Sequence, residues 1–560
     1  AFDETRFLQG KIGAYAVVAR RVGRKWFVGC LNALERRTFT VPLAFTDAGR
    51  QTVRLFRDAD PAAATPRAPV ACERLTMDAG DALAVEAAEN GGWAAIIEPA
   101  PERLPAWGDW REWGDLGDGT YANPVLPADF SDIDCITHEG CHYAITSTMQ
   151  LSPGMAVLAS TDMVTWRIIG HVVADAADLG PEFSWERMNR YGRGVWAGAI
   201  RVKGGRFHVY FGCPDEGMFV CTADRAAGPW SKPKRMSIGG GWDDCCPLFD
   251  EDGKNYFAAT HFSDNYKTYI FRMTDDALDV VQGSGVLVNE GSGREANKLY
   301  RFNGMYYHLF SEVAGGGRRL MMQRGRSPMG PYTERRILSH PQREWNEPNQ
   351  GGYLQDARGK WFFLTHHGHG DWSGRIASLL PVTWLDGWPV IGEPGEDGIG
   401  RMVWRHPMPA AFPKAPDPVA RDGFLSPEWE WNHSPNMEKV RLSGNRLELD
   451  AFPPLRYGDF FTVGNVFSKR AWRTRGNVFT VKVSVGAMAE GQRAGICHFG
   501  GTASEFGVVR WEGRLLIYHK DRESVNLGEV SGDVYLRTTW SLDGVARYAW
   551  SADGQTFTQA

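Results

Sequence analysis

The sequence lacks the patterns that mark several large classes of protein. Its nine cysteines are scattered, odd in number and never in paired CxxC spacing, which argues against a disulfide framework and a zinc finger. The formal net charge of -5 over 560 residues implies no basic face, so we expect no nucleic-acid partner. No apolar run is long enough to span a bilayer.

What the chain has instead is 65 glycines, 31 prolines and 22 tryptophans. Many turns, many short strands and abundant tryptophan predict an all-β protein whose loops bind ligands with stackable faces, and sugars fit that description. The length predicts about two to four domains. The chain starts at AFDETRF and ends at SADGQTFTQA without a signal peptide, so we expect a segment of a longer protein, from which export cannot be judged.

Residues 1–100 predict a small antiparallel β-sandwich without a cluster of catalytic groups. Its strands are expected at KIGAYAVVARR, RKWFVGCLN, RRTFTVPLAF, QTVRLFRD, DALAVEAA and GWAAIIE. The stretch from GKIGAYAVVARR to TFTVPLAF resembles the C-terminal β-domain of family 97 glycoside hydrolases. In that family the catalytic barrel lies upstream, so the resemblance implies a structural module here. Pro99, Pro101 and Pro105 mark the linker that follows.

Residues 101–415 contain an internal repeat. A turn glycine precedes an aromatic strand five times, in EGCHYAITST, GGRFHVYFG, DGKNYFAATH, NGMYYHLFSE and RGKWFFLTHH. The spacing is roughly 50 to 65 residues, within or just above the range of propeller blades. Five repeats predict a five-bladed β-propeller with its innermost strands around a central axis. A large sandwich with irregular hairpins is the alternative.

Residues 416–560 predict a second β-sandwich, of the jelly-roll type. Long alternating strands such as FTVKVSVGA, FGVVRWEGRLLIYHK and VYLRTTWSLDG favour this fold. The pattern is still running at the last residue, so we expect the final strands to be missing. The whole chain is therefore predicted to be a propeller flanked by two sandwiches.

The segment NPVLPADFSDID places three carboxylates on a stiff loop before the first repeat. These are Asp129, Asp132 and Asp134, and the two prolines before them cannot continue a helix. Asp244 and Glu295 lie a similar short distance ahead of later repeat glycines. Because a propeller brings its blade starts to one end of the axis, we expect acids with this common offset to converge and to perturb one another's pKa. Each acid taken alone would be a capping or turn residue.

Several ordered motifs resemble family 43 of the glycoside hydrolases, close to its β-xylosidases and α-L-arabinofuranosidases. NPVLPADFSDID is similar to that family's NPVLPGDFPDPS, LASTDMVTWRIIGHVV to its S-K-D-L-x-N-W strand, and GVWAGAI to GIWAPTI. NQGGYLQDARGKWFF and LLPVTWLDGWPVIG are similar to its HQGG and LxPVxWxDGWP segments. The likeness spans residues from about 115 to 412 and is carried by the order of the motifs. EWEWNHSP also resembles the domain appended to those xylosidases.

The resemblance implies a role for each acid. Asp132 aligns with the general base that activates water, and Glu295 with the general acid that protonates the leaving oxygen. Asp244 aligns with the carboxylate that tunes and orients the acid. The scheme is the inverting one, in which the two carboxyls stand about 6.5–9.5 Å apart. Asp129 or Asp134 in place of Asp132, and Asp243 in place of Asp244, are alternative registers.

The same alignment implies residues that contact sugar or lie near a metal. Trp196 would stack on a sugar face, Arg375 would hydrogen-bond sugar hydroxyls, and Met149 and Gln350 stand at matched pocket positions. The alternatives are core packing for Trp196 and a surface turn for Arg375. His366 matches a histidine near the axis, beside a structural Ca2+ or its waters, although a satisfied core histidine is the default. His366 and its neighbour point to opposite faces of a strand, which excludes joint chelation.

Several positions depart from the family's pattern, and they put the preferred sugar in doubt. The family's PDP is Ser131-Asp132-Ile133 here, its EGP is Glu295-Ala296-Asn297, and its DP is Asp244-Cys245. Met149 replaces an aromatic residue and Asn349 replaces the HQGG histidine.

The sequence thus predicts an exo-acting, inverting O-glycosyl hydrolase of plant glycans such as xylan. It should release terminal xylose or arabinofuranose and need no cofactor beyond a structural Ca2+ at most. A hydrolase of another sugar, such as a galactoside, and a non-catalytic glycan-binding propeller are the alternatives. We expect a bacterial, secreted or periplasmic protein whose partner is an oligo- or polysaccharide. The sequence does not predict its oligomeric state.

Overall fold

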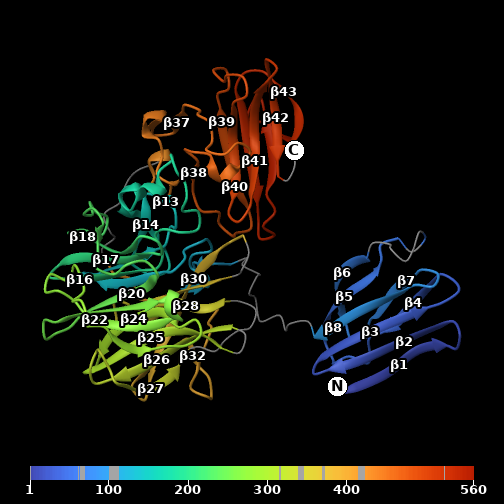
Figure 1. Ribbon diagram of the computed structural model, residues 1–560, viewed down its shortest axis with the longest axis horizontal. Coiled ribbons are helices and arrows are strands. Elements are labelled where there is room, and N and C mark those ends of the chain that lie inside the picture. The colour runs from blue at the N-terminus through green and yellow to red at the C-terminus, as the bar shows by residue number, and fades with distance from the viewer. Residues whose placement is uncertain are drawn as a thin grey trace. The chain divides into compact units, whose positions relative to one another are not determined.

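The structure is a computed structural model that describes residues 2–60, 62, 70–99, 112–314, 317–338, 346–368, 372–413, 423–521 and 524–560. In these ranges the chain forms strands, turns and short 3-10 helices but no α-helix, so the predicted all-β class is confirmed. No helix in the described part of the chain is long and apolar enough to cross a membrane. The chain divides into two compact units, Ala1–Gly108 and Asp109–Ala560 (Figure 1). The predicted boundaries at 100/101 and 415/416, with Pro101 and Pro105, lie outside the described residues.

The first unit is a six-stranded sheet covered on one face by a two-stranded one. Its strands are β1 (Glu4–Lys11), β2 (Tyr15–Val22), β3 (Lys25–Asn32), β4 (Arg37–Pro42), β5 (Arg50–Asp58), β6 (Val70–Asp78), β7 (Ala82–Ala87) and β8 (Gly92–Pro99). The order of the large sheet is β1-β2-β3-β8-β5-β6, and β4 pairs with β7. Alternate residues of β3 are buried, and they share a core with Phe39 of β4 and Val85 of β7. Sequence reasoning missed β6 and all of β1 except Lys11, because the first expected strand, KIGAYAVVARR, corresponds to β2.

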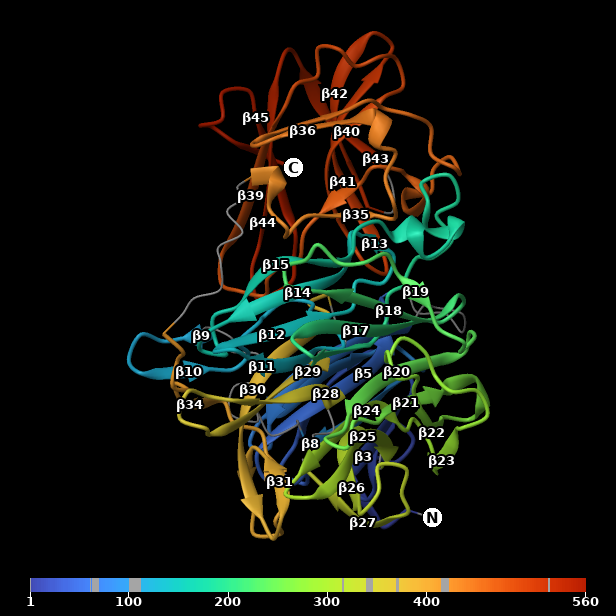
Figure 2. The same cartoon turned by 90° about the vertical axis from the view of Figure 1, so that its left-hand side faces the viewer.

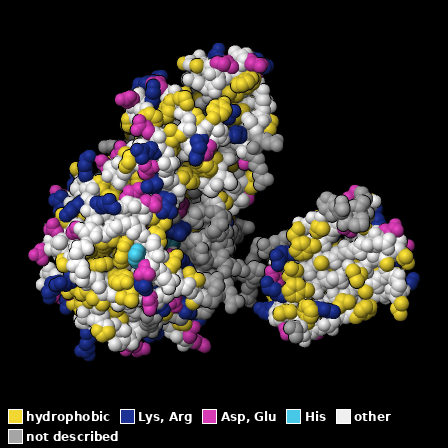
Figure 3. Space-filling view, viewed as in Figure 1, with side chains coloured by type: hydrophobic (Ala, Val, Ile, Leu, Met, Phe, Trp, Pro, Cys, Tyr) yellow, Lys and Arg dark blue, Asp and Glu magenta, His cyan; other side chains and the backbone are white. Residues whose placement is uncertain are grey.

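The other face of the six-stranded sheet carries exposed apolar side chains. Phe27 and Leu31 of β3 are 40% and 77% exposed, and Phe7 of β1 is 68% exposed. Phe27 lies opposite Ile96 of β8, and Phe7 lies opposite Val18 of β2, so these side chains belong to one face. We call Phe7, Val18, Phe27, Leu31 and Ile96 the outer apolar face. Figure 3 shows yellow hydrophobic side chains on the visible surface of this unit, with acidic and basic groups among them, as on the second unit.

Five four-stranded antiparallel sheets follow one another in the second unit (Figures 1 and 2). The first has β11 (Asp134–His138), β12 (Cys141–Thr146), β14 (Gly154–Ser160) and β15 (Arg167–Val173), and the second has β16 (Gly198–Lys203), β17 (Arg206–Cys213), β18 (Gly217–Ala223) and β19 (Lys234–Arg235). The third has β20 (Trp242–Phe249), β21 (Asn255–His261), β22 (Lys267–Arg272) and β23 (Val286–Asn289), and the fourth has β24 (Glu295–Phe302), β25 (Met305–Ala314), β26 (Gly317–Gly325) and β27 (Tyr332–Ile337). The fifth has β28 (Asn346–Gln355), β29 (Trp361–Gly368), β30 (Arg375–Leu385) and β31 (Trp388–Ile391).

The first strands of these sheets form a closed ring. β11 contacts β16, β16 contacts β20, β20 contacts β24, β24 contacts β28, and β28 contacts β11. Each repeat glycine lies in the turn between the first and second strand of its sheet, at a φ of 75–84° that favours glycine, and these are Gly140, Gly205, Gly253, Gly304 and Gly359. The glycine–aromatic pattern therefore marks the second strand of every sheet.

Segments from both ends of the ring are joined. β10 (Thr120–Ala122) pairs with β9 (Gly114–Asp115) on one side and with β34 (Arg405–Pro407) on the other. The Asn123 side chain donates to the carbonyls of Leu379 and Val403 at 2.8 and 2.7 Å. A small hairpin, β32 (Glu393–Pro394) and β33 (Gly400–Arg401), follows β31.

The C-terminal region pairs with the segment that joins β12 and β14 of the first of the five sheets, in a separate three-stranded sheet. β13 (Leu151–Ser152) pairs with β35 (Glu430–Asn432), which pairs with β38 (Phe467–Ser468). β36 (Val440–Ser443) and β37 (Arg446–Leu449) form a hairpin. Within the described ranges the 3-10 helices are η1 (Ala176–Asp178), η2 (Pro181–Phe183), η3 (Phe262–Asp264), η4 (Gly423–Leu425), η5 (Met437–Lys439) and η6 (Phe460–Thr462).

Two further sheets share one core in this region (Figure 2). One contains β39 (Asn477–Val483), β44 (Val534–Trp540), β45 (Arg547–Ser551) and β46 (Thr558–Gln559). The other contains β40 (Arg493–Phe499), β41 (Ala503–Trp511), β42 (Arg514–Lys520) and β43 (Ser524–Val530). Phe506 and Ile517 of the second sheet pack with Leu536 and Tyr548 of the first.

Candidate active site

The first strands of three sheets begin with a register shift. The shift lies between Asp243 and Cys246 in β20, between Glu295 and Lys298 in β24, and between Asn346 and Gln350 in β28. Such bulges re-aim side chains at the mouth of a strand. Asp244 lies inside the β20 bulge with a φ of 52°, and Asp132 precedes β11 with a φ of 54°. Both acids therefore lie where the backbone is outside the regular hydrogen-bond pattern of the sheet.

Asp132 is held by three neighbours. Its carboxylate accepts a hydrogen bond from Ser147 Oγ at 2.5 Å and pairs with the Arg375 guanidinium. Its backbone N–H donates to His366 Nδ1 at 2.7 Å. Burial alone would raise the pKa of Asp132, but the Arg375 charge, with help from the Ser147 hydroxyl, outweighs burial and holds the pKa below its usual value. Asp132 is therefore a fixed, ionised carboxylate at neutral pH.

Glu295 has the opposite electrostatic environment. Arg318 Nη2 lies 2.6 Å from Glu295 Oε1 and stabilises the charged form. Burial first, and then the charge of Asp244, disfavour that form more strongly and raise the pKa of Glu295 to about 7. In a large fraction of molecules the Glu295 carboxyl is thus protonated at neutral pH, which suits a general acid.

Asp244 links the two strands that carry acids. Asn297 Nδ2 donates to the Asp244 carbonyl at 2.9 Å, which ties the bulge of β20 to that of β24. Burial raises the pKa of the Asp244 carboxyl, against a hydrogen bond from the Ala296 N–H, and the Asp132 charge raises it further. The structure thus brings Asp132, Asp244 and Glu295 into one electrostatic cluster.

The other two acids of NPVLPADFSDID lie elsewhere. Asp129 is exposed, and it accepts hydrogen bonds from Ser131 Oγ at 2.6 Å and the Arg375 N–H at 2.9 Å. Asp134 is fully buried and pairs with Arg201 Nη1 at 2.7 Å. Asp129 is thus a turn acid and Asp134 a core acid, and neither contacts Glu295 or Asp244 in the described hydrogen bonds and ion pairs.

Two of the residues expected to contact sugar, Trp196 and Met149, lie next to each other. Trp196 is half-buried, with its ring 5.8 Å from that of Phe262. Its backbone N–H donates to the Gly212 carbonyl, and its indole N–H donates to the Gly192 carbonyl at 3.3 Å. Met149 is half-buried and exchanges backbone hydrogen bonds with Val195, so it lies next to Trp196.

Arg375 and Gln350 differ in how far they can reach a ligand. The Arg375 side chain is 45% exposed while it pairs with Asp132, so it can meet a ligand from solvent. Gln350 is 2% exposed and pairs with His366 behind the cluster.

His366 does not fit a directly bound metal. Burial, and then the Arg375 charge, lower the pKa of His366 to about 3, so the ring is neutral. Its Nδ1 accepts the Asp132 N–H, which places the ring proton on Nε2 and leaves no free lone pair. In the described part of the chain no group of three or more His, Cys, Asp or Glu is arranged to hold a metal ion. Ca2+ takes about six to eight oxygen ligands, whereas His366 offers only ring nitrogens, so His366 is not a direct calcium ligand.

Sequence reasoning missed Ser147, Arg318 and Lys298. Lys298 is fully buried in β24, with its Nζ 3.7 Å from Asp134 Oδ1 and 3.5 Å from the Gly198 carbonyl. Its charge favours the ionised forms of Asp132 and Asp244. A lone lysine among the apolar residues of a first strand is a visible signal for such a role, whereas nothing in GGGRRLMM singles out Arg318.

The C-terminal region contacts the loop that carries Asp132. Arg470 Nε donates to the Asp129 carbonyl at 2.8 Å, and the Arg473 N–H donates to the Pro127 carbonyl at 2.7 Å. Gln150 Nε2, next to Met149, donates to Asn432 Oδ1 at 3.1 Å. One edge of the site is therefore built on residues from both regions.

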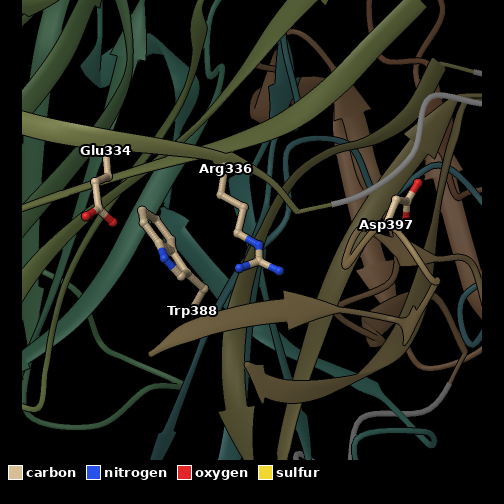
Figure 4. Close-up of a pocket in the computed structure, with 4 residues that line it drawn as sticks. All are labelled: Glu334, Arg336, Trp388 and Asp397. Atoms are coloured by element: carbon tan, nitrogen blue, oxygen red, sulfur yellow. The ribbon is translucent and has the colours of Figure 1, made fainter. Parts of the chain in front are cut away.

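A recess of about 550 Å³ lies away from this cluster (Figure 4). It is lined by Glu334, Arg336, Trp388 and Asp397, which come from the outer strands of the fourth and fifth sheets and the hairpin after them. Glu334 and Asp397 are each paired with an arginine, at 2.7 and 3.1 Å. None of the residues that line this recess is among the residues predicted for the site.

A β-xylosidase of Formosa agariphila is 30% identical over 519 residues, which cover 82% of this chain and 87% of the relative. The chain belongs to glycoside hydrolase family 43. The family model described as "Glycosyl hydrolases family 43" matches residues 121–389. The model described as "Glycosyl-hydrolase 97 C-terminal, oligomerisation" matches residues 1–98. The chain is therefore a glycosyl hydrolase, and both predicted resemblances are confirmed.

Further family 43 relatives share its fold. A non-reducing end α-L-arabinofuranosidase of Bacteroides ovatus is 28% identical, over 59% of this chain and 64% of the relative. A solved bifunctional family 43 protein of Bacteroides eggerthii is 25% identical with a TM-score of 0.67, over 78% of this chain and 58% of that one. The chain thus spans less than two thirds of these two relatives. The fold of family 43 is a β-propeller, in agreement with the closed ring of first strands.

Proposed function

We propose that this chain is an exo-acting, inverting hydrolase that releases terminal xylose or arabinofuranose from plant glycans. The observation that carries the proposal is the opposite tuning of two carboxyls: Asp132 has a lowered pKa, and Glu295 has a pKa raised to about 7. Two titratable groups whose environments shift their pKa values in opposite directions are typical of a catalytic acid and base.

In the proposed mechanism Asp132 acts on water. Its carboxylate accepts a proton from a water molecule placed at the anomeric carbon, and the oxygen of that water forms the new bond. Ser147, Arg375 and the N–H bond to His366 hold the carboxylate in one orientation, so little reorganisation is needed. Glu295 gives its proton to the leaving oxygen on the opposite face, and the bond to that oxygen breaks with inversion.

Asp244 and Arg318 have opposite effects on the pKa of Glu295. Asp244 adds negative charge, which favours the protonated acid, while Arg318 stabilises the carboxylate that forms when the proton leaves. Trp196, Met149 and Arg375 would hold the terminal sugar, the first two by contact with its face and Arg375 by hydrogen bonds. Contacts from the C-terminal region would shorten the pocket and favour chain ends.

The names of the relatives support the choice of sugars. The Formosa relative is named a β-xylosidase and the Bacteroides ovatus relative a non-reducing end α-L-arabinofuranosidase. Terminal pentoses of xylan and related glycans are accordingly the proposed substrates.

A panel of aryl xylosides, arabinofuranosides and galactosides tests the proposal. We expect turnover of a pentoside by the wild type, and a loss of about 10²–10⁴-fold in kcat for Asp132→Asn and for Glu295→Gln. Proton NMR of the first product should show the inverted anomer. If the wild type and Glu295→Gln bind sugar equally and both are inert, the chain is a binding protein instead.

We also propose that the five sheets are the five blades of the propeller, with one β-sandwich on the N-terminal side and one on the C-terminal side. Activity should need no metal, because the carboxyl pair supplies both proton transfers. Full activity after dialysis against EDTA is the expected result, and a loss that Ca2+ restores would contradict it. A secreted or periplasmic location stays a prediction.

The N-terminal unit is proposed to hold copies of the chain together. Residues 1–98 match a domain described by oligomerisation, and the outer apolar face is an uncovered sheet surface there. Phe27→Lys with Leu31→Lys should convert the assembly to monomers in sedimentation experiments and leave kcat unchanged. Exposed Val478→Lys, in the C-terminal region, is the control.

A further inference from the structure

Asp243 occupies in β20 the place that Glu295 occupies in β24. Asp243 pairs with Thr260 of β21, and Glu295 pairs with Ser311 of β25. In each strand the register shift follows directly: the next paired residue is Cys246 after Asp243 and Lys298 after Glu295. Because β20 and β24 are neighbours in the ring, the two carboxyls start from equivalent positions on adjacent sheets.

The surroundings of Asp243 leave one of its carboxyl oxygens without a hydrogen-bond partner in the part of the chain that the structure describes. The residue is half-buried, and its Oδ1 is buried with no hydrogen-bond partner among the described residues. The side chain packs against Gly212, since a Cβ there would lie 2.5 Å from Oδ1. The Gly212 carbonyl accepts the Trp196 N–H at 2.9 Å. Asp243 therefore lies between the start of the Trp196 segment and the acid cluster.

The charged groups that face Asp243 are acids. Burial first, then the charges of Asp244, Asp132 and Glu295, raise the pKa of Asp243 well above the ordinary value, against a hydrogen bond from the Asp244 N–H. Burial, and then the charges of Glu216 and Asp243, raise the pKa of the Cys213 thiol on β17. An ionised carboxylate with one oxygen buried and unpartnered would be costly, so the neutral form fits this geometry.

We propose that Asp243 is a fourth carboxyl of the pocket, which binds a hydroxyl group of the terminal sugar as a neutral hydrogen-bond donor. A neutral carboxyl offers an O–H donor and a carbonyl acceptor side by side, and a sugar hydroxyl can match both. Since it keeps its proton, Asp243 does not compete with Asp132 as a base. The inference rests on the proposed glycosidase function and names a residue that selects the sugar.

The experiment compares Asp243→Asn, Asp243→Ala and the wild type on the aryl glycoside that the wild type turns over best. The asparagine keeps the shape and a donor, so we expect kcat/KM within about 3-fold of the wild type. The alanine removes the contact, so we expect kcat/KM to fall about 10–100-fold. Asp252→Asn, on the turn after β20 and 46% exposed, is the matched control and should behave as the wild type. Melting temperatures report whether each variant is folded.

Two readouts separate a sugar contact from a structural role. On substrates that each lack one hydroxyl, the penalty of Asp243→Ala should vanish for one position and persist for the others. In the pH profile of kcat/KM, Asp243→Asn should leave the limb set by Glu295 in place, because it replaces a neutral group with a neutral group.

Three results would overturn the inference. An equal penalty on every deoxy substrate would mean that Asp243 contacts no hydroxyl. A shift of the Glu295 limb to lower pH in Asp243→Asn would mean that the native carboxyl is ionised. An inert wild type on the whole glycoside panel would refute the proposed function itself, and the inference with it, whereas an active wild type with an unaffected Asp243→Ala refutes the inference alone.

Discussion

At the scale of single residues, Asp132 and Glu295 differ in the sign of the charges around them. Asp132 has Arg375 beside it and the Ser147 hydroxyl as a donor, whereas Glu295 has Arg318 but also Asp244. The balance at Asp132 favours the charged form and the balance at Glu295 favours the neutral form. Two side chains of similar chemistry can therefore do opposite work at one pH.

The pH dependence of catalysis should follow these neighbours. The carboxylate form of Asp132 is required, so kcat/KM rises as that low-pKa group ionises, and it falls as pH rises through the Glu295 pKa of about 7. Asp244→Asn removes a negative charge, lowers the Glu295 pKa and should move the falling limb to lower pH. Arg318→Met removes the opposing positive charge and should move the same limb to higher pH. Initial rates across pH 4–9, a range of about five units, measure both shifts.

Opposite shifts for these two variants are the critical result. A common shift, or none, would mean that another group sets the falling limb. The exposed Asp224→Asn serves as the control, because its side chain is 83% exposed and pairs only with Arg206 among the described ion pairs.

At the scale of strands, the starts of β11, β16 and β24 are joined by a buried ionic cluster. Asp134 of β11 pairs with Arg201 of β16 and lies 3.7 Å from Lys298 Nζ of β24. The Asp134 carboxylate also accepts the Ile200 N–H at 2.9 Å. This cluster joins three first strands close to the proposed catalytic acids, and removal of one partner leaves buried charge uncompensated.

Asp134→Asn should therefore destabilise the ring of sheets. The amide keeps the volume but leaves Arg201 and Lys298 without their anion, and we expect a loss of about 3–5 kcal/mol. The melting temperature of the corresponding transition, measured by calorimetry because the chain has several units, reports the effect. A variant as stable as the wild type would show that the two cations find other compensation.

Local patterns in the sequence predicted the elements, and long-range contacts decided the site. Gly140 and its four equivalents could be found because a turn glycine and an aromatic strand are adjacent in the chain. The pairing of Asp132 with Arg375 joins residues 243 apart, and that of Asp134 with Arg201 joins residues 67 apart. The bulges that present Asp243 and Glu295 depend on cross-strand register, which no local pattern specifies. The predicted catalytic roles stay predictions until variants are assayed.

At the scale of the whole second unit, the C-terminal region supports the loop that carries Asp132. Arg470 donates to the Asp129 carbonyl, lies over the Phe130 ring at 5.0 Å and pairs with the buried Glu430 at 3.2 Å. Glu430 also contacts His171 at 2.9 Å, on β15 of the first sheet. The loop that ends in Asp132 thus rests on a residue more than 300 positions away in the sequence.

Arg470→Met should lower activity without removing a catalytic group. Arg470 is a positioning residue, so we expect kcat to fall about 10-fold, since a small misplacement of the base is costly. KM should change less than kcat, and Arg470→Lys should restore part of the loss. Arg441→Met, on the β36–β37 hairpin and 56% exposed, is the matched control. If KM rises and kcat is unchanged, the contact serves binding instead.

The Asn123 side chain has a consequence for how the protein is made. It bonds to Leu379 and Val403, which lie 256 and 280 residues later in the chain. Because synthesis proceeds from the N-terminus, four sheets have left the ribosome before either partner exists. The edges that the ring later closes are open during that interval, and open edges invite pairing with other chains. Expression yield should therefore depend on chaperone supply and on translation speed between residues 123 and 403, more than on the stability of any one sheet.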